Sequence, residues 1–340
     1  MDGNATTTHK NVALLSVAST IASRITTSES IDQRLQGALK RLRLPKGLLQ
    51  RVAGVYERRN WENGQTFDDA AIAAGKRALA QAGVRPDQVG LLINTSVTRK
   101  NLEPSVAVSI HHGLGLPSSA LNFDIANACL GFVNGISLAS SLIDSGQIDY
   151  AVIVAGEDAD EIQNNTVDRL EANSLNRKDF MSEFASLTLG SGAAAAVIGR
   201  ADAHPEGHRI LGGVTRAATQ FNELCVGSVD GMFTDAKALL KGGMELVVSA
   251  WNEAKTDWSW GKMDRYILHQ VSSVHTNAIV KAAGLDEAKV PRTYPLLGNI
   301  GPASIPITLA YEAEDLKKGD RVLLMGVGYG LNTAMLEIAW

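Results

Sequence analysis

Short apolar runs alternate with segments of helical periodicity along the first half of the chain. The runs are rich in aliphatic residues and predict buried strands over residues 12–19, 89–96, 121–126, 150–156 and 187–199. Between them, apolar residues spaced three and four apart predict helices over residues 30–42, 68–83, 105–115 and 130–143. Strands that alternate with helices in this way indicate an α/β fold.

The second half of the chain repeats this order in kind. Three predicted strands of the second half correspond to strands of the first half. They cover residues 209–217, 265–270 and 321–328. Predicted helices cover residues 234–253, 273–284 and 303–316. The repeat is one of pattern and not of residue identity, and it indicates an internal duplication with a shared, layered core. We therefore expect two similar halves, at residues 11–200 and 208–340.

Three segments depart from the alternation. Residues 1–10 are polar and predict a disordered tail. Residues 54–61 predict a loop. Residues 158–183 are polar, charged and too long for an ordinary connection, which indicates an insertion that lies over the core and covers a binding channel.

Composition narrows the classes of function. The chain has 340 residues and 45% hydrophobic content, enough for one large domain or two fused halves. Its 32 basic and 36 acidic residues give a net charge of −4, which offers no reason to expect nucleic acid as a partner. Two cysteines make no disulfide framework, the N-terminus does not resemble a secretory signal, and the apolar runs are too short to span a bilayer. We therefore expect a soluble, cytoplasmic protein.

Cys129 is the first candidate for chemistry, because it lies between a predicted strand and the predicted helix 130–143. Unpaired N–H groups at a helix N-terminus stabilise a thiolate, so we expect a lowered thiol pKa that suits a nucleophile. The alternative is a small buried hydrophobic residue, as free cysteines often are. Cys225 has no base beside it in the sequence, and we expect a packed thiol.

Two polar residues of the second half can join Cys129. His269 closes the predicted strand 265–270, and Asn299 lies in a glycine-flanked loop before a helix. Functional sites in open α/β sheets form at the carboxyl ends of strands, so these residues can converge. Together they offer a nucleophile and two donors for a carbonyl oxygen that gains charge. Taken singly, His269 could be a core histidine and Asn299 a turn former.

Arg58 and Arg59 lie beside Trp61 in the segment predicted to be a loop. They could hold a phosphate-bearing nucleotide by charge and stacking. The alternative is solvated charge whose stems pack on Trp61. Metal binding is not expected, because His111 and His112 have no carboxylate or cysteine at ligand spacing.

Four blocks of the sequence resemble a known family. Residues 127–132 (NACLGF), 267–270 (ILHQ), 298–306 (GNIGPASIP) and 326–331 (GVGYGL) are similar, in order and separation, to blocks of thiolase-fold condensing enzymes of the ketoacyl-ACP synthase III type. Residues 91–97, 102–105 and 213–217 are similar to the OleA-type members, which join two fatty acyl-CoA molecules head to head. The resemblance implies an α/β thiolase fold, with two pseudo-symmetric βαβαβ-type halves in a layered αβαβα core.

The resemblance also implies catalytic roles. Cys129 would take the first acyl group from a thioester. His269 and Asn299 would hold the carbonyl oxygen of the second thioester as its α-carbon becomes nucleophilic. Backbone N–H groups of Cys129 and Tyr329 would hold the oxyanion at the acyl-enzyme carbonyl. Tyr329 stands where relatives carry a smaller residue, and we expect it to narrow the site.

Glu103 separates two sub-functions. Synthase III enzymes that decarboxylate a malonyl thioester need no base and typically carry an apolar residue at the matching position. In OleA-type enzymes this loop reaches across a dimer into the partner's site. Facing an apolar pocket, Glu103 would have a raised pKa and could remove the α-proton of an acyl thioester. The alternative is a surface carboxylate that caps the helix 105–115.

The family's block at the CoA entrance matches at Arg58 and Arg59, next to Trp61. The sequence therefore predicts a homodimeric acyltransferase that condenses two acyl-CoA thioesters without decarboxylation and gives a β-keto acid or its thioester. No metal or redox cofactor is expected. The OleA likeness alone implies a place in olefin or ketone synthesis, with further pathway enzymes as downstream partners.

Two alternatives stay open. One is a decarboxylating 3-oxoacyl-ACP synthase III type enzyme that uses a malonyl thioester and leaves Glu103 idle. The other is a non-catalytic acyl-binding homologue. Loss of Cys129, His269 or Asn299 would be expected there, and all three are present.

Overall fold

The first half of the chain forms a sheet in the computed structural model, which describes residues 6–172, 175–228, 230–255 and 257–340. Its strands are β2 (Val12–Ile21), β5 (Leu91–Asn94), β6 (Leu121–Asp124), β7 (Tyr150–Glu157) and β8 (Gly192–Arg200). They pair in the order β2-β8-β7-β5-β6. β5 runs parallel to β6 and β7, whereas β8 runs antiparallel to β2 and β7. The strands predicted in this half are confirmed, but β6 is an edge strand and half exposed rather than buried.

The second half repeats this pairing. Its strands are β9 (His208–Ala217), β12 (Arg265–Leu268), β13 (Arg321–Gly328) and β14 (Asn332–Ala339), in the order β9-β14-β13-β12. β13 is parallel to β12 and antiparallel to β14, as β7 is to β5 and β8. Ala13 and Leu14 of β2 pair with β9 and join the two halves. β1 (Thr6–Thr8) pairs with β9, so the predicted tail is wrong there, while residues 1–5 lie outside the described residues.

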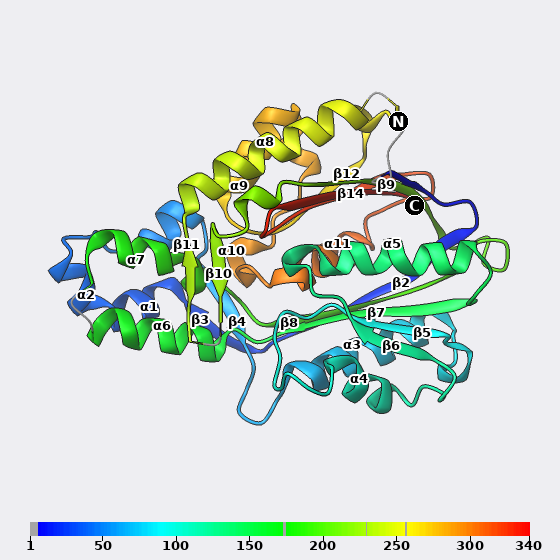
Figure 1. Ribbon diagram of the computed structural model, residues 1–340, viewed down its shortest axis with the longest axis horizontal. Coiled ribbons are helices and arrows are strands. Elements are labelled where there is room, and N and C mark those ends of the chain that lie inside the picture. The colour runs from blue at the N-terminus through cyan, green and yellow to red at the C-terminus, as the bar shows by residue number, and fades with distance from the viewer. Residues whose placement is uncertain (1–5, 173–174, 229, 256) are drawn as a thin grey trace.

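The helices complete five layers. The central layer, between the two sheets, holds α5 (Gly131–Asp144) and α11 (Ser304–Glu312). The outer layers hold α3 (Phe67–Ala82) and α4 (Val106–Leu114) on one side, and α8 (Ala236–Ala254) and α9 (Ser273–Ala283) on the other (Figure 1). α5 buries one broad apolar face in the central core, including Phe132, Ile136 and Ile143, while Leu138 and Ser141 lie on an exposed stripe. The predicted layered αβαβα core is confirmed.

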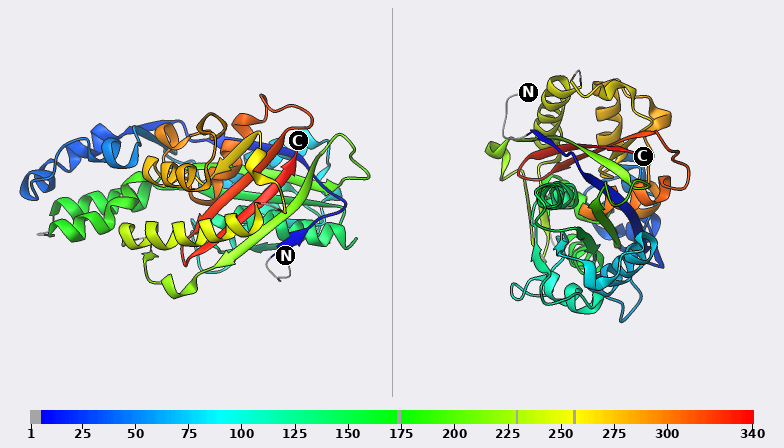
Figure 2. Two further views of the ribbon diagram at one scale, coloured as in Figure 1. Left: turned by 90° about the horizontal axis from the view of Figure 1, so that it is seen from above. Right: turned by 90° about the vertical axis from the view of Figure 1, so that its right-hand side faces the viewer.

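A helical lobe extends from one end of these layers, as Figure 2 shows in blue and green. It contains α1 (Ser28–Arg34), α2 (Gln36–Arg41), the π-helix η1 (Leu49–Ala53), α6 (Asp160–Ala172) and α7 (Arg177–Glu183). The predicted insertion 158–183 is therefore helical, and it packs on α1 and α2 around its own apolar cluster. The predicted helix 30–42 is split at Leu35.

The remaining elements are short. The strand pairs are β3 (Arg24–Thr27) with β4 (Glu57–Asn60) and β10 (Cys225–Gly227) with β11 (Met232–Thr234), so the loop predicted over residues 54–61 is wrong at β4. The short helices are η2 (Pro86–Gln88), η3 (Ala128–Leu130), η4 (Phe184–Thr188), η5 (Thr219–Phe221), η6 (Trp260–Lys262), η7 (Glu287–Lys289), α10 (Tyr294–Leu297) and η8 (Gly301–Ala303). Within the described ranges, no helix combines the length and the apolar character needed to cross a membrane.

Candidate active site

Cys129 lies in a tight turn between β6 and α5. The turn is the 3-10 helix η3, and its first residue, Ala128, has a φ of 44°, a left-handed conformation that costs a non-glycine residue energy. β13 passes very close to it, because a Cβ on Gly328 would lie 3.1 Å from the carbonyl oxygen of Asn127. The turn is thus held from both sides, and Cys129 is only 6% exposed.

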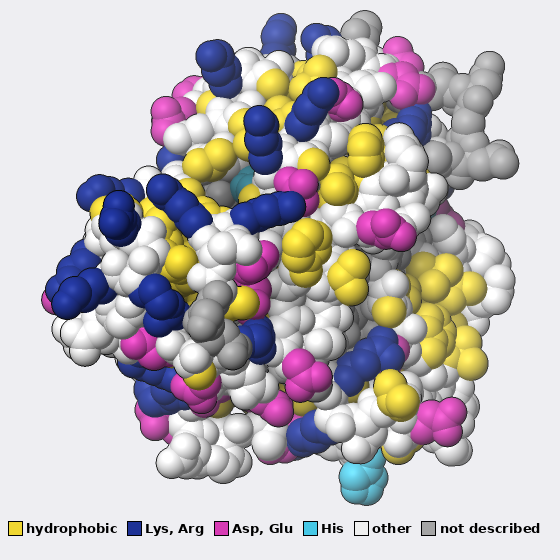
Figure 3. Space-filling view, turned by 60° about the vertical axis from the view of Figure 1, so that its left-hand side comes forward, with side chains coloured by type: hydrophobic (Ala, Val, Ile, Leu, Met, Phe, Trp, Pro, Cys, Tyr) yellow, Lys and Arg dark blue, Asp and Glu magenta, His cyan; other side chains and the backbone are white. Residues whose placement is uncertain are grey.

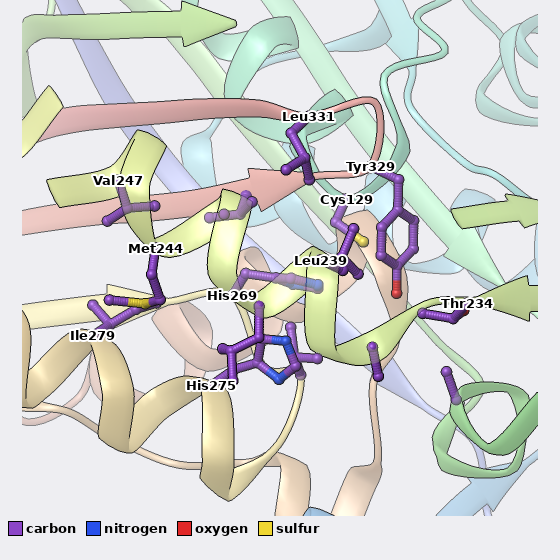
Figure 4. A pocket seen from close by; sticks show the side chains of 16 residues that line it. Cys129, Thr234, Leu239, Met244, Val247, His269, His275, Ile279, Tyr329 and Leu331 are labelled. Carbon is purple, nitrogen blue, oxygen red and sulfur yellow. The ribbon is translucent and has the colours of Figure 1, made fainter. Parts of the chain in front are cut away.

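The Cys129 side chain borders a cavity between α8, α9 and the end of β13 (Figure 4). Most of the lining is aliphatic, and its polar side chains are few. The lining includes Leu239, Met244, Val247, Ile279 and Leu331, and its polar members are Thr234, His269, His275 and Tyr329. Just after the insertion, Ala185 contributes to the lining, whereas none of the described residues of 158–183 does. That the insertion covers a binding channel stays a prediction.

Burial dominates the acidity of the nucleophile. It raises the pKa of the Cys129 thiol, and the nearby Glu157 carboxylate and Cys225 raise it further. The prediction of a lowered pKa at the helix N-terminus is therefore wrong in the free protein, since desolvation of the thiolate outweighs the helix. A thiol with this pKa is protonated at neutral pH, so acylation requires a group that accepts its proton.

His269 can serve as that group. It follows β12, its backbone N–H donates to the carbonyl oxygen of Met325, and its side chain borders the same cavity as Cys129. Burial, with His275 nearby, lowers the pKa of His269 to about 3. The imidazole is therefore neutral at physiological pH, with one nitrogen that accepts a proton and one that donates. Its Nδ1 atom is buried without a hydrogen-bond partner among the described residues.

Asn299 is oriented by its own loop. Its Oδ1 atom accepts a hydrogen bond of 3.0 Å from the backbone N–H of Gly301, and Nδ2 has no partner within the described ranges. Gly298, with a φ of 70°, brings the chain so close to Thr188 that a Cβ would lie 2.6 Å from its carbonyl oxygen. The following turn, η8, packs against the Cys129 turn η3. The loop therefore leaves the amide donor of Asn299 available beside the nucleophile's turn.

Tyr329 lies at the turn between β13 and β14, and its ring stands beside Cys129 in the cavity (Figure 4). Its hydroxyl is hydrogen-bonded to the thiol of Cys225, whose Sγ lies 3.4 Å from Oγ1 of Thr234. Cys225 is partly buried and packs against the apolar cluster that contains Leu239 and Leu331, so the expected packed thiol is confirmed. The role expected of the Tyr329 backbone N–H stays a prediction.

Glu103 stands apart from the Cys129 cavity of its own chain. It is exposed on the loop between β5 and α4 and does not appear among the residues that line the cavity. The alternative that it caps α4 is wrong, because Asp124 accepts the hydrogen bonds from the first backbone N–H groups of that helix, those of Val106 and Ala107. The carboxylate of Glu103 is free to meet a second molecule.

The expected CoA-entrance residues lie differently from what the sequence predicts. Arg58 is fully buried in β4, and its guanidinium donates to the carbonyl oxygens of Thr26 (3.3 Å) and Leu187 (2.9 Å). Trp61 is 6% exposed, with its indole N–H bonded inside the protein. The prediction that these two side chains hold a nucleotide is therefore wrong. Arg59 is partly exposed and pairs with Glu57, and its contact with CoA stays a prediction.

The sequence did not predict a role for Glu157, a carboxylate near the site. Glu157 ends β7 and is 7% exposed, and burial raises its pKa to about 7, although hydrogen bonds from Thr98 and Val97 oppose the rise. The available signal was a glutamate directly after an otherwise apolar strand, at the sheet edge where the other site residues gather.

Figure 3 shows where the surface is hollowed. A histidine side chain is visible inside the hollow, and several Lys and Arg side chains lie along its rim, next to acidic and apolar ones. Such a rim suits a ligand that carries phosphate groups at one end. Among the described residues, no group of three or more His, Cys, Asp or Glu side chains gathers as a metal site would require.

Comparisons with known proteins agree with this site. Residues 123–218 match the 3-oxoacyl-[acyl-carrier-protein] synthase III family, and residues 254–340 match its C-terminal model. The chain is 42% identical to an acyl-CoA:acyl-CoA alkyltransferase of Xanthomonas campestris, over 97% of this chain and 99% of that protein. It is 33% identical to the Shewanella oneidensis protein of the same name, over 98% and 99%. A β-ketoacyl-[acyl-carrier-protein] synthase III of Caldanaerobacter subterraneus is 27% identical over 84% of this chain and 87% of its own.

Solved structures extend the likeness to the fold. An OleA variant of Xanthomonas campestris with bound lauric acid and lauroyl-CoA has a TM-score of 0.95 and 42% identity, and covers 98% of this chain and 100% of its own. Cerulenin-bound OleA of the same organism has a TM-score of 0.96 at the same identity, and covers 98% of both chains. These likenesses cover nearly the whole chain, so they include both halves of the fold.

Proposed function

Since the chain belongs to the acyl-CoA:acyl-CoA alkyltransferases, a family of thiolase-fold condensing enzymes of the synthase III type, we propose that it joins two fatty acyl-CoA molecules head to head by a Claisen condensation without decarboxylation. The observation that carries the proposal is a buried thiol and a neutral histidine on one apolar cavity. The aliphatic lining suits an acyl chain, whose thioester carbonyl would lie at the thiol.

In the first half-reaction the Cys129 sulfur attacks the thioester carbonyl of one acyl-CoA. Neutral His269 accepts the thiol proton and passes it to the leaving CoA sulfur. Backbone N–H groups of Cys129 and Tyr329 hold the oxyanion of the tetrahedral intermediate. The products are free CoA and an acyl thioester on Cys129.

In the second half-reaction a second acyl-CoA places its carbonyl oxygen between the N–H of His269 and Nδ2 of Asn299. Glu103 of the partner subunit removes the α-proton, and the two donors stabilise the enolate oxygen. The α-carbon attacks the acyl carbonyl on Cys129, a carbon–carbon bond forms, and the cysteine leaves as thiolate. The product is a 3-oxoacyl-CoA, and its hydrolysis gives the β-keto acid.

The exposed face beside Glu103 supports the proposal of a homodimer. β6 lies at the edge of its sheet, where unpaired backbone groups invite another chain. Apolar side chains stand out around it: Leu102 is 92% exposed, and Val97, Leu121 and Val108 are about half exposed. A second copy packed symmetrically on this face would cover these side chains and bring each Glu103 toward the other chain's site.

Complementation between subunits tests this arrangement. A heterodimer is formed from one Cys129→Ala subunit and one Glu103→Gln subunit, and each homodimer alone serves as the control. If Glu103 acts in the partner's site, one of the two sites of the heterodimer is complete, and condensation reaches about half the wild-type rate per dimer. If the heterodimer condensed acyl-CoA no faster than the two variant homodimers do, the result would contradict the proposal.

We also propose that no metal or redox cofactor takes part, because the two half-reactions transfer protons and acyl groups and leave no electrons to be accepted. We place the reaction in the cytoplasm, where the two free cysteines stay reduced. The product would pass to further enzymes of long-chain olefin or ketone synthesis.

A further inference from the structure

Glu157 binds the root of the loop that carries Glu103. Its Oε1 atom accepts a hydrogen bond of 2.7 Å from the backbone N–H of Val97. Its Oε2 atom accepts two from Thr98, one from the backbone N–H (3.1 Å) and one from the hydroxyl (2.6 Å). The Thr98 hydroxyl accepts a bond in turn from the N–H of Asp158, so the end of β7 and the start of the loop are tied together.

The same carboxylate also faces the reaction site of its own chain. A Cβ on Gly301 would lie 3.7 Å from Cδ of Glu157, so the carboxylate lies in contact range of the turn that follows Asn299. It is also near enough to raise the pKa of the Cys129 thiol. Glu157 therefore lies between the Asn299 loop and the root of the Glu103 loop.

The second half of the chain lacks such a carboxylate. Gly328 ends β13 and pairs with the start of β14, just as Glu157 ends β7 and pairs with the start of β8. A buried carboxylate is costly unless hydrogen bonds compensate for it, and the fold does without one at the matching position. The difference between the halves is that the first must hold a long loop after β5.

We propose that Glu157 is a positioning residue that fixes the root of the Glu103 loop and so determines where that carboxylate enters the partner's site. This inference rests on the proposed function, in which Glu103 is the base. Beyond its root the loop is exposed, and Leu102 is 92% exposed. Lys100 pairs with Asp68 on the surface (2.6 Å), so the anchor at Val97 and Thr98 is the buried part of what holds the loop. A displacement of about 1 Å at a reacting group can cost about 100-fold in rate.

Glu157→Gln tests the anchor with little change in size. The glutamine amide nitrogen cannot accept a hydrogen bond, so at least one of the three bonds to the loop is lost. We expect the first half-reaction to continue, with one CoA released per Cys129 at a rate within about twofold of wild type. Condensation should fall by about 10- to 100-fold. Amide hydrogen exchange in the 97–104 segment should become at least about tenfold faster.

Glu171→Gln is the matched control, because Oε2 of Glu171 accepts a backbone N–H bond from Ala38 in the helical lobe, away from the site. We expect its condensation rate to stay near wild type. If Glu157→Gln does not fold, Thr98→Val replaces it. This variant removes the two bonds of the hydroxyl, to Glu157 and from the Asp158 N–H, and keeps the backbone bond of Thr98 to Glu157. Thr98→Ser should restore both hydroxyl bonds. Equal loss of both half-reactions in Glu157→Gln or Thr98→Val would indicate a general structural role and overturn the proposal.

The Glu103→Gln variant separates this proposal from the function on which it rests. If Glu103→Gln retains the full condensation rate, Glu103 is not the base, and the positioning role proposed for Glu157 fails with it. If Glu103→Gln loses condensation while Glu157→Gln keeps it, only the positioning role fails. If both act at one step, the double variant should be no slower than Glu103→Gln alone, whereas a further tenfold loss would show that Glu157 acts elsewhere.

Discussion

Replacement of Arg58 distinguishes a structural arginine from a CoA-binding one. Its guanidinium is fully buried and donates to two carbonyl groups that are distant in the sequence, those of Thr26 and Leu187. Its Cβ also packs against the backbone at Gly298, next to Asn299. Arg58→Met keeps the stem that makes this contact and removes only the charged head.

The cost can be worked from these contacts. The buried carbonyl group of Leu187 and the partly buried one of Thr26 each lose this partner, and each such loss costs up to about 1–3 kcal/mol. Relief from burying a cation, whose burial lowers the pKa of Arg58 to about 10, offsets part of this loss. We expect a net loss of about 2–4 kcal/mol in the free energy of unfolding, or roughly 3–6 °C in Tm for a chain of this size.

Thermal unfolding and acyl-CoA kinetics decide the matter together. Arg58→Met should lower Tm as stated and leave the KM for acyl-CoA within about twofold of wild type. The control, Arg59→Met, removes a partly exposed ion pair with Glu57 that is worth about 0–1 kcal/mol, so its Tm should barely change. If Arg58→Met left Tm unchanged and raised the KM for acyl-CoA tenfold or more, the structural role would be wrong and Arg58 would be a CoA-binding residue.

Three further predictions follow from the site. Asn299→Asp puts an acceptor where the enolate needs a donor, so condensation should fall by about 100- to 1,000-fold while the acyl-enzyme still forms in a quenched single turnover; a loss below tenfold would contradict this role. The pKa of His269 is about 3 in the folded protein and near 6.5 in the unfolded chain, so between pH 6.5 and pH 3 only the unfolded chain protonates this imidazole. The free energy of unfolding should therefore decrease as the pH is lowered from about 6.5 to 3. The urea midpoint of His269→Asn should decrease less over the same range. Tyr329→Ser should shift product ratios from mixed acyl-CoA toward longer chains, and an unchanged ratio would show that the ring does not narrow the cavity.

Much of the fold could be predicted because burial leaves a clear pattern. Strands such as β7 and β8 are covered on both faces, so they read as continuous apolar runs. The helix after Cys129 buries a broad apolar face between the sheets, and this face is visible in the sequence. The site residues Cys129, His269 and Asn299 could be found because each follows a strand or begins a helix.

The remaining features depend on contacts that are distant in the sequence. β4 reads as a charged loop, but β3 pairs with it, and the carbonyl groups that hold Arg58 come from residues 26 and 187. The helix N-terminus before α5 predicted an acidic thiol, whereas the depth of burial decides the pKa of Cys129. Glu157 was missed because its donors, Val97 and Thr98, belong to a different strand and loop.

The central claim is that two acyl-CoA molecules are joined without decarboxylation. The most direct test incubates the pure protein with one long-chain acyl-CoA alone, follows free CoA, and seeks the ketone by mass spectrometry, because β-keto acids lose carbon dioxide spontaneously. We predict continuous CoA release and a symmetric ketone, both lost in Glu103→Gln except for one CoA per Cys129. CoA release by the wild-type protein that stops at one equivalent per Cys129, and resumes only with a malonyl thioester, would contradict the account.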